Sequence, residues 1–346
     1  MKSLIENLRA LLLLGRVSNL PTVWSNLLVG WIIADGPWMG PARVGYIGPN
    51  ETFWPLLFLL LGGSFLYTGG MYLNDYCDIA FDTRYCPGRP IPAGKISRRT
   101  VGLLAILWFT AGCALFTIFG PVTIGFALSL IAAIVLYDFH HKDVAYAPLL
   151  MGFCRCLLYL LAFSSFREAH WFDIGYGDWR DHALNYMRND FWSMAWDVIK
   201  FLPAALPLGL YVAGIAYLAR GESRPGKTTR WPLMLLLLAV IVLAGIYYGI
   251  LIRSFHWLPV QNPHEYLLLL VRLLVPWLFL PAWMAWLLIP FWRKTKPSIG
   301  RVVSGLLAGI VLLDMIVIAP RVGPYAIILL PLFILALLLQ RFVPAT

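Results

Sequence analysis

FWPLLFLLLGGSFLYTGGMYL, residues 53–73, runs directly into NDYCDIAFD, residues 74–82. The first run is apolar and long enough to cross a bilayer as a helix. On a continuing helix, Asp75, Asp78 and Asp82 are three and then four residues apart, which predicts that they share one face. Three like charges this close repel one another unless a cation lies between them, and hard carboxylate oxygens favour Mg²⁺. A solvated helix end is the plainer alternative, but charges beside a membrane segment need a functional reason.

The loop that follows reads RYCPGRPIPAGKIS, residues 84–97, and is rich in basic residues, proline and glycine. Proline fixes the backbone and glycine permits tight turns, so we expect Arg84, Arg89 and Lys95 to be held near the acids. Acids for a metal and cations for an anion describe a metal–diphosphate site better than a bare cation site. The alternative is a cytoplasmic basic loop, which explains Arg98 and Arg99.

The composition is that of a membrane protein. Of the 346 residues, 60% are hydrophobic and 13% are charged, whereas soluble chains carry about a quarter charged residues. We therefore expect a single polytopic membrane domain over residues 1–346. The net charge of +10 comes from basic residues scattered between apolar runs, which argues against nucleic-acid binding. The five cysteines show no CxxC pair and no zinc spacing.

Apolar runs along the chain predict an all-α protein with nine or ten transmembrane helices. Only a short turn around Pro320 and Pro324 separates the last two, so they could count as one helix or two. A further helix, Met1–Arg16, is expected to lie in the interface. The predicted membrane runs are Val17–Ala34, Phe53–Leu73, Val101–Gly120, Pro121–Tyr137, Val144–Phe163, Phe201–Ala219, Trp231–Ile252, Tyr266–Phe291, Val302–Ala319 and Val322–Leu339.

The positive-inside rule orients these helices. With this set of runs, 18 of the 27 Lys and Arg residues fall on the side that holds both termini and the acidic stretch. We therefore expect a multi-pass protein of the bacterial inner membrane whose acidic stretch faces the cytoplasm. On the opposite side, residues 164–200 form a long segment rich in aromatic and acidic residues, which predicts a helix or two in the outer headgroup layer.

Three charged residues fall inside the predicted helices. A buried Arg in lipid is costly, so Arg155 should face a cavity and have the diphosphate or a motif acid as its partner. For Arg272 and Asp314, an ion pair between the eighth and ninth helices is the simpler expectation. The adjacent His140 and His141 point apart and do not suggest a metal site.

The acidic stretch resembles the NDxxDxxxD motif of the UbiA superfamily of intramembrane prenyltransferases. The resemblance includes Arg89-Pro90 and the residues GKIS at 94–97. It also includes RVSNLPTVWSN, residues 16–26, followed by Gly30. It covers roughly Arg16–Arg230 and fades afterwards.

This resemblance implies helices around a central cavity that opens to the cytoplasm and sideways to lipid. It assigns an Mg²⁺–diphosphate of an isoprenyl donor to Asn74, Asp75, Asp78 and Asp82, with Asp75 and Asp78 catalytic. It also makes Lys142, after Tyr137, an anion contact and a catalytic residue. Diphosphate contacts are expected from Arg84, Arg89, Lys95, Lys142, Arg155 and Arg220. The pocket for the prenyl chain and acceptor is expected to include Trp24, Asn26, Tyr67 and Tyr72, and Phe81 is a further aromatic candidate.

The chain departs from the family pattern after the sixth helix, where relatives carry a second acidic motif. Here that position reads YLARGESR, residues 217–224, and no Asp occurs between Asp197 and Asp314. We expect Arg220, with Arg224, to supply positive charge directly as a catalytic group, because Arg can replace a metal beside phosphate. Glu222 would orient Arg220 or serve as a lone metal ligand.

The sequence thus predicts a Mg²⁺-dependent prenyltransferase with an isoprenyl diphosphate donor and an acceptor of open identity. A phosphatidyl-alcohol transferase would show DGxxAR, but Asp78 is followed by Ile79 and Ala80. The remaining alternative is a membrane protein that binds or transports a lipid diphosphate and kept only the first motif.

Overall fold

The computed structural model describes residues 2–34, 49–140, 144–172, 191–220, 231–257, 263–292 and 298–344. These ranges are helical or connect helices, and they contain no strand. The elements are α1 (Lys2–Leu14), η1 (Val17–Asn19), α2 (Leu20–Ala34), α3 (Pro49–Cys77), α4 (Ile79–Tyr85), α5 (Arg98–Phe116), α6 (Pro121–His140), α7 (Ala147–Phe172), α9 (Phe191–Arg220), α10 (Pro232–Trp257), α11 (Pro263–Trp292), α12 (Ile299–Val322), η3 (Gly323–Leu329) and α13 (Leu330–Leu339).

The predicted all-helical membrane fold is confirmed. Within the described ranges, eight helices are long and apolar enough to cross a membrane, and Leu274–Ile289 and Tyr325–Leu339 are shorter apolar helices. The last two predicted helices are separate. α12 continues through Pro320 to Val322, and a 3₁₀ segment then leads into α13.

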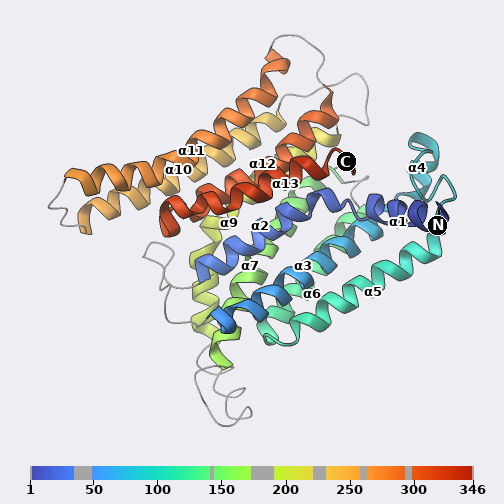
Figure 1. Cartoon of the computed structure of the whole chain (residues 1–346), viewed down its shortest axis with the longest axis horizontal. Helices are drawn as coiled ribbons and strands as arrows, with labels where there is room; N and C mark the ends of the chain where they lie inside the picture. The colour runs from blue at the N-terminus through green and yellow to red at the C-terminus, as the bar shows by residue number, and fades with distance from the viewer. Residues whose placement is uncertain are drawn as a thin grey trace.

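Helix α7 lies at the centre of the packing, against α2, α6 and α9, while α12 packs against α2, α9 and α11. α2, α3, α5 and α6 run side by side, and α1 and α4 lie together at one end of the bundle (Figure 1). Small residues allow these close contacts. A Cβ at Gly152 of α7 would lie 2.3 Å from the carbonyl oxygen of Gly209 in α9, so α7 and α9 approach backbone to backbone.

The N-terminus of α6 is capped from α7. The two carboxylate oxygens of Glu168 accept hydrogen bonds from the backbone N–H groups of Val122 at 3.0 Å and Thr123 at 2.8 Å. A carboxylate at a helix N-terminus satisfies donors that lack an intrahelical partner. Glu168 is buried, and α7 extends nine residues past its predicted end at Phe163. The interfacial placement of 164–200 stays a prediction, since 173–190 lie outside the described residues.

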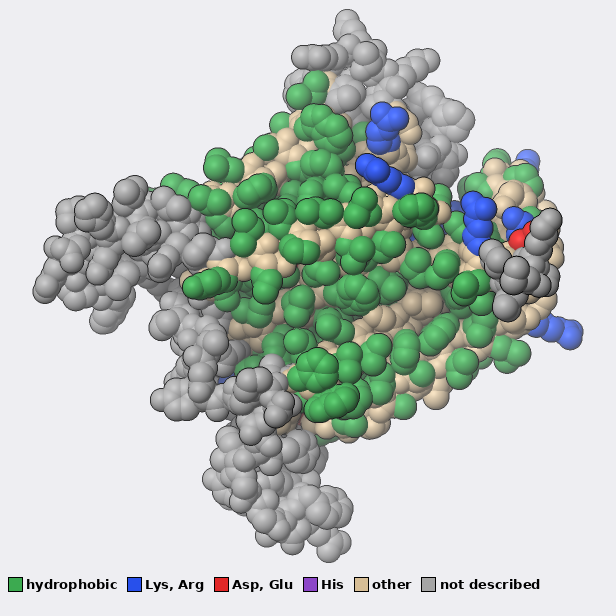
Figure 2. Space-filling model, viewed as in Figure 1, with side chains coloured by type: hydrophobic (Ala, Val, Ile, Leu, Met, Phe, Trp, Pro, Cys, Tyr) green, Lys and Arg blue, Asp and Glu red, His purple; other side chains and the backbone are tan. Residues whose placement is uncertain are grey.

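The surface seen in Figure 2 is mainly hydrophobic over the body of the bundle. The Lys and Arg side chains visible on that face lie toward the end that holds α1 and α4 (Figures 1 and 2). Exposed apolar side chains such as Leu103, Met234 and Leu278 belong to membrane-length or shorter apolar helices. An apolar surface of this kind suits contact with lipid tails.

Candidate active site

The acidic stretch lies on a kinked helix rather than on a straight one. α3 ends at Cys77 and α4 begins at Ile79, with Asp78 between them at φ −83° and ψ 0°. Helical hydrogen bonds still bridge the kink, from Asp78 N to Asn74 O and from Asp82 N to Asp78 O, both 2.9 Å. Asp75, Asp78 and Asp82 are 5%, 8% and 2% exposed, so this is no solvated helix end.

One cation of the basic loop, Arg89, contacts the acids. Arg89 Nη1 lies 2.9 Å from Asp82 Oδ2 and 3.5 Å from Asp75 Oδ1. Burial lowers the pKa of the Arg89 guanidinium, but Asp75 and Asp82 together outweigh burial and hold that pKa above its usual value. By contrast, Arg84 and Lys95 are exposed, and neither forms an ion pair with the acids in the described part of the chain. The expectation of three loop cations beside the acids thus holds for Arg89 alone.

Arg16 contacts the acidic stretch, although the sequence analysis did not predict this contact. Its Nη2 lies 3.3 Å from Asn74 Oδ1 and 3.5 Å from Asp75 Oδ1. The backbone of Arg16 is left-handed, with φ 41° and ψ 48°, where α1 gives way to η1. A non-glycine residue held there costs about 1–3 kcal/mol, a strain that tends to occur at functional sites. The available signal was its position at the start of the RVSN segment, just before a membrane helix.

Asp138 is a second residue that the sequence analysis missed. It lies near the C-terminal end of α6, and its Oδ1 accepts a hydrogen bond from Asn74 Nδ2 at 3.1 Å, with both side chains buried. A carboxylate accepts but does not donate, so this contact sets the orientation of the Asn74 amide. The amide oxygen is thereby turned toward Arg16 and the acidic stretch. A lone Asp at the end of an apolar helix was the signal in the sequence.

If Asp138 positions Asn74, replacing it with leucine should lower kcat/KM about 10–100-fold, as is usual for residues that orient metal or substrate ligands. Asp138→Asn should lose less, because its amide oxygen can still accept from Asn74 Nδ2. Steady-state kinetics of both variants would check this. Equal losses in the two variants would argue for charge, rather than orientation, as the contribution of Asp138.

Of the charged residues predicted around positions 142 and 217–224, the structure describes only Arg220. Arg220 donates from Nη1 to the carbonyl of Ala145 at 3.1 Å and from Nη2 to that of Val144 at 3.0 Å. Arg220 therefore fixes the backbone at Val144 and Ala145. Its direct role at a diphosphate stays a prediction. Lys142, Glu222 and Arg224 lie outside the described residues.

The predicted pocket aromatics lie in different places. Tyr67 donates from its hydroxyl to the backbone carbonyl of Arg16 at 3.3 Å. Tyr72 donates to the carbonyl of Leu11 at 3.1 Å and is buried in a small apolar cluster with residues of α1 and α5. Trp24 donates from Nε1 to Ser64 Oγ at 2.8 Å. Of these three, Tyr67 is the one that touches a residue contacting the acidic stretch.

Arg155 does not pair with a motif acid, which was one of its two expected partners, and the other, the diphosphate, stays a prediction. Its Nη1 donates to Asn26 Oδ1 at 2.9 Å, and Asn26 Nδ2 donates to Asp314 Oδ2 at 2.8 Å. The other oxygen of Asp314 accepts from Tyr159. This network joins α2, α7 and α12. Asp314 thus bonds to α2 and α7 rather than to α11, and the side chain of Arg272 lies outside the described residues.

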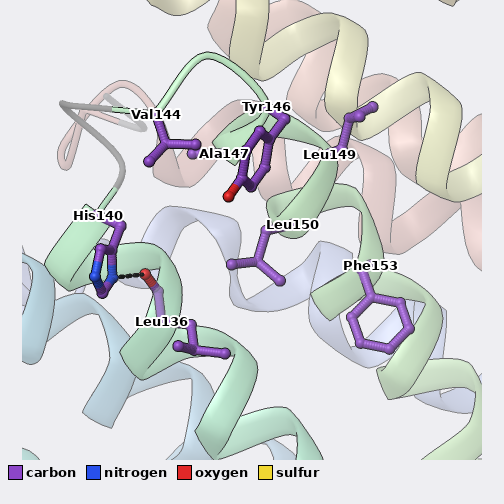
Figure 3. A pocket seen from close by; sticks show the side chains of 8 residues that line it. All are labelled: Leu136, His140, Val144, Tyr146, Ala147, Leu149, Leu150 and Phe153. Carbon is purple, nitrogen blue, oxygen red and sulfur yellow. Dashed lines mark hydrogen bonds between the residues drawn. The ribbon is translucent and has the colours of Figure 1, made fainter.

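A groove of about 490 Å³ lies between the C-terminal end of α6 and the start of α7 (Figure 3). It is lined by Leu136, His140, Val144, Tyr146, Ala147, Leu149, Leu150 and Phe153, and His140 Nδ1 hydrogen-bonds to the Leu136 carbonyl. Asp138 is two residues, or about 200° around the helix, from both Leu136 and His140. The groove therefore opens on the opposite side of α6 from the acids. The predicted central cavity stays a prediction.

The acidic stretch has the donor chemistry that Mg²⁺ requires. Among the described residues, no three His, Cys, Asp or Glu side chains converge closely enough to hold a metal by themselves. Magnesium seldom uses such a cage and is commonly held by one or two carboxylates together with the phosphates of a substrate. Asp75 and Asp78, with the oriented oxygen of Asn74, fit that pattern.

Comparison with known proteins places the chain in a family. A family model described as the UbiA prenyltransferase family matches residues 38–298. A 4-hydroxybenzoate octaprenyltransferase of Aeromonas hydrophila is 25% identical over 66% of this chain and 72% of that relative. A digeranylgeranylglyceryl phosphate synthase of Sulfolobus acidocaldarius is 36% identical over 28% of this chain and 36% of its own length. A solved structure described for such a synthase aligns over 98% of this chain and 99% of its own, with a TM-score of 0.47 and 16% identity, which is a loose likeness. By the extent of the family match, the protein is a member of the UbiA prenyltransferase family.

Proposed function

We propose that this protein transfers an isoprenyl group from an isoprenyl diphosphate to an acidic acceptor, with Mg²⁺, at the acidic stretch. The observation that carries the proposal is the juxtaposition of buried carboxylates with Arg16 and Arg89. Carboxylates alone repel a diphosphate, and guanidinium groups alone bind it without a metal. Together they form a site that suits a metal-bound diphosphate.

The two arginines have a defined task in this proposal. In the structure, Arg16 is paired with Asp75, and Arg89 with Asp75 and Asp82. Each guanidinium offers several N–H donors, so it can turn toward phosphate oxygens while staying near the acids. As the bond between the prenyl carbon and oxygen breaks, negative charge grows on the departing diphosphate, and fixed donors stabilise it.

Mg²⁺ held by Asn74, Asp75, Asp78 and Asp82 would neutralise the phosphate oxygens of the bound donor. Among these four residues, Asn74 has the side-chain orientation that Asp138 fixes, so its amide oxygen would be oriented before the metal binds. Glu222, Lys142 and Arg220 remain proposed contributors from the loops that follow α6 and α9. Tyr67 is the aromatic group best situated to face an allylic cation, since it lies beside Arg16.

The acceptor class is suggested by the relatives. The name of the Aeromonas hydrophila relative contains hydroxybenzoate, and that of the Sulfolobus acidocaldarius relative contains glyceryl phosphate. Both are acids. The distribution of Lys and Arg along the chain supports a multi-pass protein of the inner membrane with the site on the cytoplasmic side.

Turnover by the purified full-length protein tests this proposal. With labelled geranyl diphosphate, Mg²⁺ and a panel of acidic acceptors, we expect released diphosphate and prenylated product in equal amounts. Chelating the metal with EDTA should stop both, and added Mg²⁺ should restore them. Saturable binding of geranyl diphosphate without release, across the whole panel, would instead favour a lipid-diphosphate binding or transport protein.

A further inference from the structure

Arg155 is a buried cation with most of its hydrogen-bonding capacity unused. It lies eight residues after the start of α7, roughly 12 Å along the helix axis, and is 9% exposed. Its bond to Asn26 is its sole hydrogen bond in the described part of the chain, where it also forms no ion pair. A guanidinium has five N–H donors, and leaving a buried charge so sparsely paired is costly. Such a group indicates a binding partner that arrives from outside the chain.

Asn26 holds Arg155 in place without neutralising it. The Asp314 carboxylate can only accept, so the Asn26 amide must turn Nδ2 toward Asp314 and Oδ1 toward Arg155. Asp314 is itself occupied by Asn26 and Tyr159. The guanidinium is therefore fixed at one nitrogen, and none of the described residues accepts a hydrogen bond from its remaining donors.

This cation lies deeper in the bundle than the acidic stretch. Arg16, which contacts Asn74 and Asp75, precedes α2, whereas Asn26 is six residues into α2. That separation corresponds to roughly 9 Å of helix axis, before the length of η1 is added. A diphosphate at the level of Arg16 already has Arg16 and Arg89 as partners. Arg155 is thus suited to a different anionic group on a different molecule.

We propose that Arg155, held by Asn26, binds the carboxylate of the acceptor and so selects acidic acceptors. A planar guanidinium matches a carboxylate with two parallel hydrogen bonds. One positive charge balances one carboxylate, whereas a phosphate monoester would leave excess negative charge in an apolar interior. Asp314, beyond Asn26, disfavours the phosphate further. The proposal rests on the proposed function and adds the group that the acceptor must carry.

Equilibrium binding tests this inference separately from turnover. The probes are 4-hydroxybenzoate, 4-hydroxybenzamide and 4-hydroxyphenyl phosphate, and the readout is tryptophan fluorescence of the full-length protein. We expect the wild type to bind the carboxylate at least about tenfold more tightly than the amide, given the strength of charge-assisted hydrogen bonds. Arg155→Gln should remove that difference and leave geranyl diphosphate affinity within about twofold.

Arg155→Lys keeps the charge but loses the planar pair of donors, and it should retain part of the preference for the carboxylate. The Lys variant replaces Arg155→Gln in the binding test if the Gln variant does not fold. Equal affinities for acid and amide in the wild type would overturn the inference, as would a preference for the phosphate probe. A loss of geranyl diphosphate affinity in Arg155→Gln would place Arg155 at the donor instead. Absent turnover alongside intact acid preference would count against the proposed function and not against this inference.

Discussion

Prenyl transfer by an Asp75→Ala variant is expected to fall by at least about 10²–10³-fold, the usual cost of removing one preorganised electrostatic group. Asp75 is buried and is the carboxylate that both Arg16 and Arg89 contact. No Asp occurs between Asp197 and Asp314, so the segment after the sixth predicted membrane helix offers no second pair of aspartates. The loss of one carboxylate from the first motif should therefore not be compensated. Product formation from labelled geranyl diphosphate is the measurement.

The nature of the loss is as informative as its size. Removing Asp75 also frees Arg16 and Arg89 from a competing carboxylate, so inorganic diphosphate should bind at least as tightly as before in the absence of metal. The stimulation of binding by Mg²⁺ should disappear. Asp75→Asn, which keeps the shape of the side chain, should behave like Asp75→Ala. Glu6→Gln, on the exposed face of α1, is the matched control and should retain full activity. Substantial turnover by Asp75→Ala would overturn the assignment of this stretch.

Replacing Asp314 with leucine is expected to destabilise the folded protein by about 3–5 kcal/mol, the usual cost of breaking a buried charged network from one side. Asn26 Nδ2 and the Tyr159 hydroxyl would each lose a buried acceptor. The Arg155 charge would also lose the carboxylate beyond Asn26. Thermal unfolding in detergent, followed by tryptophan fluorescence, would show a lowered midpoint.

Two variants separate the contributions to this stability. Asp314→Asn keeps an oxygen acceptor and should cost less than leucine. Tyr159→Phe removes one donor and leaves Asp314 bonded to Asn26, so we expect a loss of about 1–2 kcal/mol. A leucine variant as stable as the wild type would show that close packing at this position can replace the network, as occurs for some buried ion pairs.

The membrane helices could be predicted from the sequence because hydropathy reports burial in lipid directly. The run Val17–Ala34 was predicted with the bounds that the structure gives for the membrane span. Hydropathy could not reveal that this run begins with the 3₁₀ turn η1, nor that Arg16 takes a left-handed backbone there. The kink at Asp78 was missed for the same reason, since helical spacing describes both a straight and a bent helix.

The acids were found because they lie together in the sequence, and their partners were missed because those partners are distant in it. Arg16 is 58 residues from Asn74, and Asp138 is 64 residues from it. Arg155 was identified as a costly buried charge, but its partner Asn26, 129 residues away, was assigned to it by the fold alone. No local spacing rule connects such pairs, because contacts between helices depend on packing.

The most direct test of the central claim is binding of geranyl S-thiolodiphosphate, a donor analogue that resists transfer, measured by titration calorimetry with and without Mg²⁺. We predict saturable binding to the wild type that Mg²⁺ strengthens, and a loss of at least about tenfold in affinity in the double variant Arg16→Gln with Arg89→Gln. Arg84→Gln, which changes an exposed cation in the last turn of α4, should bind like the wild type. Undiminished binding by the double variant would contradict a diphosphate site at the acidic stretch.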